Sequence, residues 1–130
     1  MEIEVFFEDN LKVNARVGDH IVKTDQPLKA GGDNTANSPF DLFLASLATC
    51  AGIFVKQFCA SRGIDTKGIR LIQRHVFNPE THMIGHIEIE VILPKDFPEK
   101  YRDVIVKVVD QCAVKRHMMN PPEFSVKTTI

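Results

Sequence analysis

The chain has 130 residues, 44% hydrophobic and 25% charged, which is enough to bury the core of an ordinary globular domain. Its formal net charge is -1, with basic residues spread along the chain, and this excludes the usual footprint of a nucleic-acid-binding protein. Three cysteines and an acidic, alternating start from Met1 favour a cytoplasmic protein without a disulfide framework or a secretory signal.

The first part of the chain is predicted to form strands. Polar and apolar residues alternate over residues 2–8, 11–17 and 20–25, and Gly18-Asp19 marks the turn between the last two. Together they predict a small antiparallel meander. The residues that follow, 30–37 ("AGGDNTAN"), have the composition of a loop.

A long helix is predicted between Ser38 and Gly63. Ser38 suits the N-cap, Pro39 suits the first helical position, and Asp41 three residues after Ser38 resembles a capping box. The segment is apolar nearly all round, so we expect it to be buried on most faces. Its longest uncharged run, residues 42–55, is shorter than the roughly 18 residues of a membrane span, and no membrane is expected as a partner.

The second part predicts a hairpin, a helix and a last strand. Residues 68–78 and 83–93 are strand-like and flank the turn "PETH". A second helix is predicted to begin at Asp96 and to carry Cys112 on its buried face, at its end. Residues 113–119 suit one more short helical turn, and residues 123–130 a closing strand. This order predicts an α+β fold, with residues 1–130 forming a single domain.

The three cysteines differ in which partners they can reach. Cys59 follows Cys50 by nine positions, which places the two thiols on opposite faces of one helix and about 13 Å apart along its axis. A disulfide needs Cα atoms within about 7 Å, so only Cys112 could pair with Cys50 in this chain, after folding. On position alone, three buried core cysteines are the favoured interpretation.

Two other kinds of site have little support. The five histidines include no helical i, i+4 pair, so a zinc site is weakly indicated. The glycine-containing loop lacks the lysine of a phosphate-binding loop. The sequence therefore predicts no metal and no cofactor.

Two stretches resemble the OsmC/Ohr family. The run "TDQPLKAGGDNTANSPFDLFLASLATCAGIFV" is similar to the family's signature region, which has a glycine-containing loop, an N/S-P-x-E/D-L-type helix start, a small-residue stretch and a cysteine inside the helix. "VVDQCAVKRHM" is similar to the region of the second family cysteine. The resemblance covers essentially the whole chain, and "SPFDL" is closest to the YhfA-like branch.

The resemblance implies a fold, a chemistry and partners. The expected fold is an intertwined homodimer with antiparallel sheets around two long central helices and active sites at the dimer interface. The expected activity is thiol-dependent reduction of organic hydroperoxides, a defence against oxidative stress. Cys50 would be the peroxidatic cysteine, and its apolar surroundings would admit a hydrophobic hydroperoxide. Cys112 would be the resolving cysteine, and an external dithiol the reductant.

The residues that activate the thiolate in the peroxidase branches differ here. Those branches use an arginine from the N-terminal part and a glutamate early in the helix. At the glutamate position this chain has Phe40, with Asp41 one residue later, and its first arginine is Arg16, in a predicted strand. Arg16 and Asp41 are kept as candidate site residues, with Arg116, His117 or the partner subunit as other sources of a positive or donor group. We expect the pKa of Cys50 to be less depressed than a dedicated peroxidase needs.

Two further functions stay open at this point. One is a non-catalytic or weakly reactive protein that binds an apolar or thiol-reactive small molecule in the interface pocket. The other is a structural dimer with inert cysteines. The availability of the Cys50 thiolate distinguishes the peroxidase from the binding protein.

Overall fold

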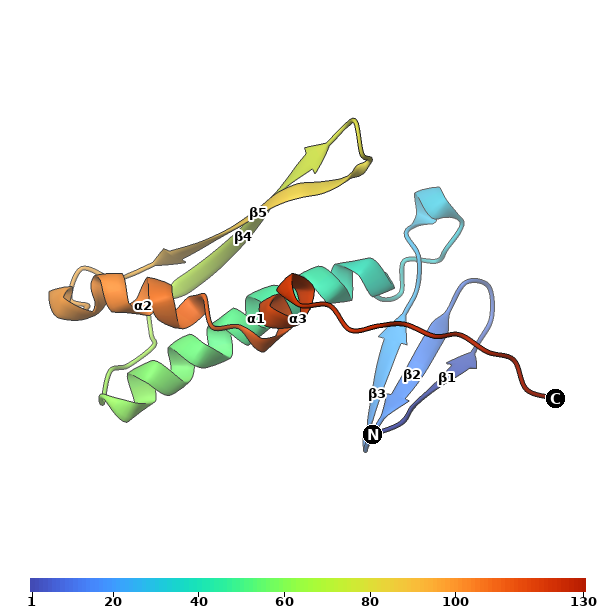
Figure 1. Cartoon of the computed structure of the whole chain (residues 1–130), viewed down its shortest axis with the longest axis horizontal. Coiled ribbons are helices and arrows are strands. Elements are labelled where there is room, and N and C mark those ends of the chain that lie inside the picture. Colours follow the sequence, from blue (N-terminus) through green and yellow to red (C-terminus); the bar gives the residue numbers. More distant parts are fainter. The chain divides into compact units, whose positions relative to one another are not determined.

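The computed structural model describes residues 1–130, which form two compact units, Met1–Ala45 and Ser46–Ile130. Figure 1 labels the strands and helices in chain order. The long helix α1 crosses the boundary between the units, so its first turns belong to one unit and the rest to the other. The prediction that residues 1–130 form one domain stays a prediction.

The N-terminal unit contains the predicted meander. Strands β1 (Ile3–Phe7), β2 (Val13–Val17) and β3 (His20–Thr24) are antiparallel neighbours in that order. The register pairs Ala15 with Val5 on one side and with Val22 on the other. The strand prediction is thus confirmed, with each end shifted by at most two residues, and a short 3-10 turn (Leu28–Ala30) lies in the predicted loop region.

A buried carboxylate organises the loop after β3. Asp25 is 0% exposed. Its two oxygens accept the hydroxyl of Thr35 at 2.6 Å and the backbone N–H groups of Thr35, Gln26 and Asp33 at 3.0, 2.7 and 3.5 Å. The hydroxyl and amide of Thr35 make the largest contributions to lowering the pKa of this carboxyl below its usual range. A buried carboxylate is stable only with such donors, and in return it fixes the loop that leads into α1.

Asp25→Ala is expected to lower the melting temperature of the protein by about 10 °C, because it leaves several buried donors without an acceptor. Thermal unfolding followed by circular dichroism measures this. Asp19→Ala, an exposed change in the turn between β2 and β3, is the matched control and is expected to have little effect. An equal, small shift in both variants would contradict the structural role of Asp25.

Helix α1 (Pro39–Ser61) begins and ends as its sequence predicts. The Ser38 Oγ accepts the backbone N–H of Asp41 at 3.2 Å, and Gly63 beyond the last turn has a φ of 65°. The expected burial on most faces is wrong for this chain. The buried side chains form one stripe, and Ile53 on another face is 47% exposed. That stripe consists of Leu47, Ala51, Val55, Phe58 and Cys59.

Residues Pro39–Ala60 of α1, 22 in number, are long and apolar enough to cross a membrane by length and composition. The uncharged run, residues 42–55, is shorter than a membrane span. The longer window of 22 residues contains only two charged residues, Asp41 and Lys56. Length and composition are weak evidence, because the core helix of a soluble protein passes the same test. Three residues of the buried stripe, Val55, Phe58 and Cys59, belong to the core cluster of the second unit.

The second unit packs the predicted hairpin against α1. Strands β4 (Arg70–Asn78) and β5 (Met83–Ile92) are antiparallel, with an irregularity between Val76 and Phe77. On the exposed face, Arg74 forms ion pairs with Glu88 and Glu90. The core cluster joins α1, the hairpin and the helix that follows; its buried members are Val55, Phe58, Cys59, Phe97 and Ile105.

The second helical region is shorter than expected and is interrupted. A 3-10 turn (Glu99–Tyr101) precedes α2 (Arg102–Val109), and α3 (Ala113–Met119) follows. Pro98 explains the late start, since the residue before a proline avoids helical backbone and proline has no N–H. Cys112 therefore lies after α2, at the N-cap of α3, rather than within the second helix.

The predicted closing strand is absent. Residues 121–130 have no regular secondary structure, and their side chains are exposed. The alternating pattern of "EFSVKTTI" suits a strand, but a strand needs a neighbour to accept and donate its backbone hydrogen bonds. No strand of the chain pairs with this segment.

Candidate redox site

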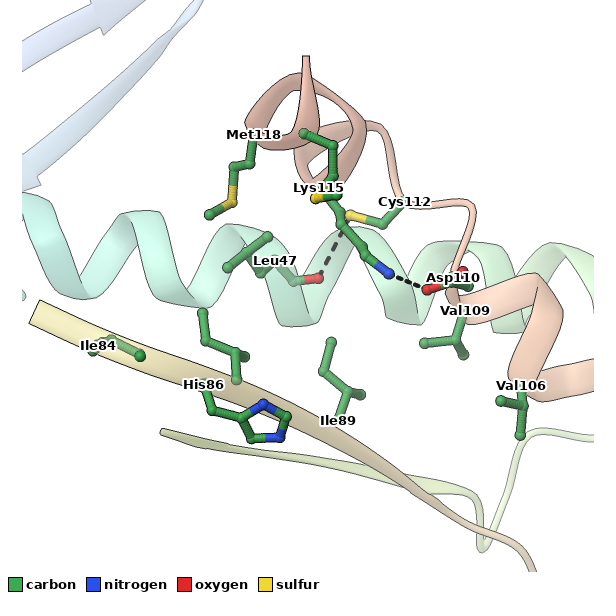
Figure 2. Close-up of a pocket in the computed structure, with 13 residues that line it drawn as sticks. Leu47, Ile84, His86, Ile89, Val106, Val109, Asp110, Cys112, Lys115 and Met118 are labelled. Carbon is green, nitrogen blue, oxygen red and sulfur yellow. Dashed lines mark hydrogen bonds and ion pairs between the residues drawn. The ribbon is translucent and has the colours of Figure 1, made fainter. Parts of the chain in front are cut away.

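The structure brings Cys50 and Cys112 together, as folding was expected to do. Cys50 lies in the middle of α1 and is half-buried, while Cys112 at the start of α3 is 2% exposed. The two thiols are close enough for each to shift the pKa of the other, and both are free. The Cys112 thiol donates to the backbone oxygen of Leu47 at 3.9 Å, drawn as a dashed line in Figure 2.

The surroundings of Cys50 lower its pKa. The largest contribution comes from the backbone N–H of Val114, which donates to the sulfur; burial opposes it. The thiol of Cys112, the backbone N–H of Ala113 and the charge of Arg116 act in the same direction as Val114. All of these groups belong to one short segment, 112–116. A thiolate at Cys50 thus has hydrogen-bond donors and a positive charge, the conditions under which a cysteine becomes nucleophilic.

The pKa of Cys112 shifts the other way. Burial is the largest cause of its rise, and the neighbouring Cys50 adds to it by accepting the Cys112 proton. The backbone N–H groups of Lys115 and Val114 act in the opposite direction without reversing the shift. Within the pair, Cys50 is therefore the thiol that ionises more readily.

Cys59 has a different environment. Its side chain is 0% exposed and belongs to the core cluster with Val55 and Phe58. Burial raises its pKa, and Arg62 opposes this rise only in part. Cys59 therefore has the environment of a core cysteine, as its place in the helix predicts.

The other two candidate residues lie in the N-terminal unit. Arg16 is in β2, with its guanidinium carbon 5.9 Å from the centre of the Phe6 ring. Asp41 lies in the first turn of α1, where its backbone N–H donates to the Ser38 side chain. This is the helix-start position expected for Asp41, and a catalytic role for either residue stays a prediction.

Sequence reasoning missed the backbone donors to Cys50. The sequence predicts a helix over residues 113–119 and offers Arg116 as a candidate cation, but it does not indicate the N–H groups of Ala113 and Val114 as donors. Nearly every residue type has a backbone N–H group, so the sequence does not show which of these groups will act as donors. The only available signal was a cysteine immediately before a short helix, since the first N–H groups of a helix have no partner within it.

A cavity of about 510 Å³ opens beside Cys112, within the second unit. Figure 2 shows side chains from α1, β5, α2 and α3 around it. The wall is mainly apolar, and its charged side chains, Asp110 and Lys115, form an ion pair with each other. It is lined by Leu47, Ile84, Gly85, His86, Ile87, Ile89, Val106, Val109, Asp110, Cys112, Lys115, Met118 and Met119.

Metal ligands do not cluster in this structure: no group of three or more histidine, cysteine, aspartate or glutamate side chains could hold a metal ion. The polar groups at the site are thiols, backbone amides and one nearby arginine. The redox chemistry that these groups can support is that of sulfur itself.

Comparison with known proteins gives one family and several similar folds. The family model for OsmC-like protein matches residues 31–127. None of the curated proteins matches the chain. The structural neighbours include a protein from Psychrobacter arcticus 273-4 whose name refers to osmotic stress and a detoxification response; it is 21% identical, with a TM-score of 0.73 over 88% of this chain and 85% of the neighbour.

Two further neighbours share the fold at low identity. An OsmC-like protein from Mycoplasma pneumoniae is 13% identical, with a TM-score of 0.70 over 92% of this chain and 87% of the neighbour. An organic hydroperoxide resistance protein from Legionella pneumophila is 16% identical, with a TM-score of 0.54 over 90% of this chain and 87% of the neighbour. These likenesses establish the α+β fold expected from the sequence.

Proposed function

The chain belongs to the family of OsmC-like proteins, and from this premise we propose that it reduces organic hydroperoxides through Cys50 and Cys112. The observation that carries the proposal is the neighbouring pair of free thiols, in which the pKa of Cys50 is lowered and that of Cys112 is raised. The name of the Legionella pneumophila neighbour, an organic hydroperoxide resistance protein, supports the same activity.

The proposed reaction has two steps in the protein. The Cys50 thiolate attacks an oxygen of the peroxide, a sulfur–oxygen bond forms, and the oxygen–oxygen bond breaks. The leaving alkoxide takes a proton to become an alcohol, and Cys50 becomes a sulfenic acid. The Cys112 sulfur then attacks the Cys50 sulfur, and the hydroxyl leaves as water with the Cys112 proton. The product is a Cys50–Cys112 disulfide, which an external dithiol reduces by exchange.

The asymmetry of the pair suits these roles. The first step needs a thiolate, and the donors at Val114 and Ala113 stabilise one at Cys50. In the second step Cys112 gives up its proton as it attacks the Cys50 sulfur, and its raised pKa means that Cys50 is the first of the two to ionise. The mutual effect of the two thiols on their pKa values supports their proximity, which condensation to a disulfide requires.

Peptide mapping after a sub-stoichiometric dose of cumene hydroperoxide tests the proposal. The expected product is a Cys50–Cys112 disulfide, with Cys59 still free to alkylate after unfolding, because Cys59 lies in the core. Untreated protein is the control for oxidation in air. A major disulfide that contains Cys59, or consumption of the peroxide without any Cys50–Cys112 disulfide, would rule out the resolving role of Cys112.

The pH dependence of alkylation is expected to separate the two thiols. Iodoacetamide reacts with the thiolate, so the reaction speeds up as pH rises through the pKa. The midpoint for Cys50 in a Cys59→Ser/Cys112→Ser protein is expected below the value of about 8.5 for a free cysteine. That for Cys112 in a Cys50→Ser/Cys59→Ser protein is expected above it.

Arg116→Ala is expected to raise the Cys50 midpoint slightly, since its charge is the smallest of the named contributions. Arg102→Ala, an exposed arginine at the start of α2, is the matched control. A midpoint well below 7 that rises in Arg16→Ala would instead identify Arg16 as the activating arginine, and the expectation of a modest pKa shift at Cys50 would be wrong.

The proposed assembly is a cytoplasmic homodimer of intertwined subunits. Exposed apolar side chains along α1, such as Ile53, are the kind of surface that a second subunit covers. Unfolding is then expected to be coupled to dissociation, so the melting temperature should rise with protein concentration. A folded monomer in sedimentation at micromolar protein would refute this assembly.

A ligand-binding function without turnover is the second candidate, and the apolar cavity beside Cys112 favours it. Such a protein would bind an apolar or thiol-reactive small molecule and leave the hydroperoxide unreduced. Titration with a fluorescent apolar probe would then show binding, while peroxide consumption with a dithiol would stay at the rate of the dithiol alone.

A further inference from the structure

Two of the four methionines are adjacent in the sequence and line the same cavity. Met118 and Met119 are the last two residues of α3, and both belong to the wall of the cavity of about 510 Å³. Their side chains are 45% and 73% exposed, so neither is part of the core. Figure 2 shows Met118 extending from α3 toward α1, on the side of Leu47. The proposed thiol chemistry uses neither methionine.

A third methionine provides a comparison within the same chain. Met83 at the start of β5 is 68% exposed, nearly the same fraction as Met119, but it does not line the cavity. Its thioether therefore meets solvent about as readily as that of Met119, without the surroundings that the cavity provides. A difference in reactivity between these two thioethers is thus an effect of the cavity and not of exposure.

The cavity is suited to a neutral, apolar molecule. Its volume falls in the range of ligand pockets, roughly 300–1,000 Å³. Aliphatic side chains of α1, α2 and β5 line it, and its charged residues, Asp110 and Lys115, neutralise each other by their ion pair. An organic hydroperoxide gains free energy by entering, because its alkyl or aryl group leaves water. Hydrogen peroxide has no apolar group to bury and gains nothing in this way.

We infer that Met118 and Met119 are a modification site, oxidised to methionine sulfoxide by organic hydroperoxides that enter the cavity, and that this closes the cavity to apolar molecules. The thioether sulfur attacks the terminal oxygen of the hydroperoxide, so that a sulfur–oxygen bond forms and the oxygen–oxygen bond breaks. The hydroxyl now on sulfur gives its proton to the departing alkoxide, which leaves as an alcohol. Sulfur loses two electrons and the peroxide gains them, and no cysteine takes part.

The product changes the polarity of the wall. Methionine is a flexible, apolar side chain, whereas its sulfoxide is polar. An apolar occupant would have to displace the water that two sulfoxides bind, so the cavity loses its preference for such molecules. The change is reversible, because methionine sulfoxide reductases restore the thioether. The pair of methionines therefore limits binding when hydroperoxide is in excess and permits it again after reduction.

The sites of oxidation are measured on the Cys50→Ser/Cys112→Ser protein, whose thiol pair cannot consume peroxide, and on the unchanged protein with peroxide in excess. Peptides are mapped by mass after partial reaction. With hydrogen peroxide, Met119 and Met83 are expected to react within about twofold of each other, since their exposures are similar. With cumene hydroperoxide, Met118 and Met119 are expected to react about tenfold faster than Met83.

The pH dependence of the reaction separates thioether from thiol chemistry. A thioether has no proton to lose, so the rates at Met118 and Met119 are expected to be equal at about pH 6 and about pH 9. Oxidation of a cysteine requires the thiolate and becomes faster over the same range. A rate of methionine oxidation in the unchanged protein that rises with pH would show that it proceeds through a cysteine, against the inference.

Binding of Nile red, a neutral apolar dye, measures the effect on the cavity. Treatment of the Cys50→Ser/Cys112→Ser protein with cumene hydroperoxide is expected to raise the Kd of the dye about tenfold. Adding Met118→Leu/Met119→Leu gives an apolar wall that cannot be oxidised, and the Kd is then expected to stay within about twofold after treatment. Met83→Leu, a change outside the wall, is the matched control and should lose affinity as the parent does.

Three results would overturn the inference. With cumene hydroperoxide, rates at Met119 no higher than at Met83 would show that the hydroperoxide does not collect in the cavity. Sulfoxides at Met118 and Met119 without a change in the Kd of Nile red would remove the effect on binding. An equal loss of affinity in the Met118→Leu/Met119→Leu protein would assign that effect to another residue. None of these results depends on a disulfide, so each leaves the proposed function standing.

Discussion

Cys50→Ser is expected to reduce hydroperoxide turnover by about a thousandfold or more, which corresponds to roughly 4 kcal/mol of activation free energy. A serine hydroxyl at this position cannot ionise near neutral pH, even with the N–H groups of Val114 and Ala113 pointing to it. Consumption of cumene hydroperoxide in the presence of a dithiol measures the loss.

Other variants in the same assay show whether the loss of turnover is specific to Cys50. Cys59→Ser, matched in chemistry, is expected to retain activity within about threefold once its folding is verified, because Cys59 contacts the core and not the thiol pair. Arg16→Ala and Asp41→Asn are expected to cost far less than Cys50→Ser. Activity that survives Cys50→Ser, or falls equally in Cys59→Ser, would exclude Cys50 as the peroxidatic residue.

Cys112→Ser is expected to leave the first step intact and to block the second. Cys50 should then accumulate as a sulfenic acid after one peroxide, because the neighbouring thiol that would condense with it is gone. Mass spectrometry after dimedone treatment detects this species as an adduct on the Cys50 peptide. Steady turnover with a dithiol is expected to fall about tenfold or more, since an external thiol must replace one held in place.

The unchanged protein and the Cys50→Ser/Cys112→Ser protein are the two controls for this experiment. The first should show little dimedone adduct, because its sulfenic acid condenses with Cys112, and the second should show none. A large adduct in the unchanged protein, or full turnover in Cys112→Ser, would contradict the resolving role of Cys112.

The limits of several elements could be predicted because local chemistry fixes them. Ser38 and Gly63 mark the ends of α1, and the hydrogen bond from the Asp41 N–H to the Ser38 side chain confirms the cap. Strands β4 and β5 follow from their composition on either side of a turn. The late start of α2 after Pro98 could also have been foreseen, since a proline restricts the residue before it.

The closing strand shows where a local pattern is insufficient. Residues 123–130 alternate as a strand does, yet they form none, because strand formation depends on a pairing partner elsewhere. The burial of α1 shows the same limit. Its apolar composition predicts burial without stating which element covers each face, and within this chain only one stripe is covered.

The sequence by itself determined which cysteines could form a pair. The spacing of Cys50 and Cys59 places them on opposite faces of one helix, so Cys112 was the only possible partner for Cys50. Tertiary structure alone decided the chemistry of that pair. It brought the backbone N–H groups of Ala113 and Val114 to the Cys50 sulfur and buried Cys112 beside an apolar cavity. The physical reason is that a pKa and an access route depend on surrounding donors, charges and solvent, which segments far apart in the chain supply only after they pack together.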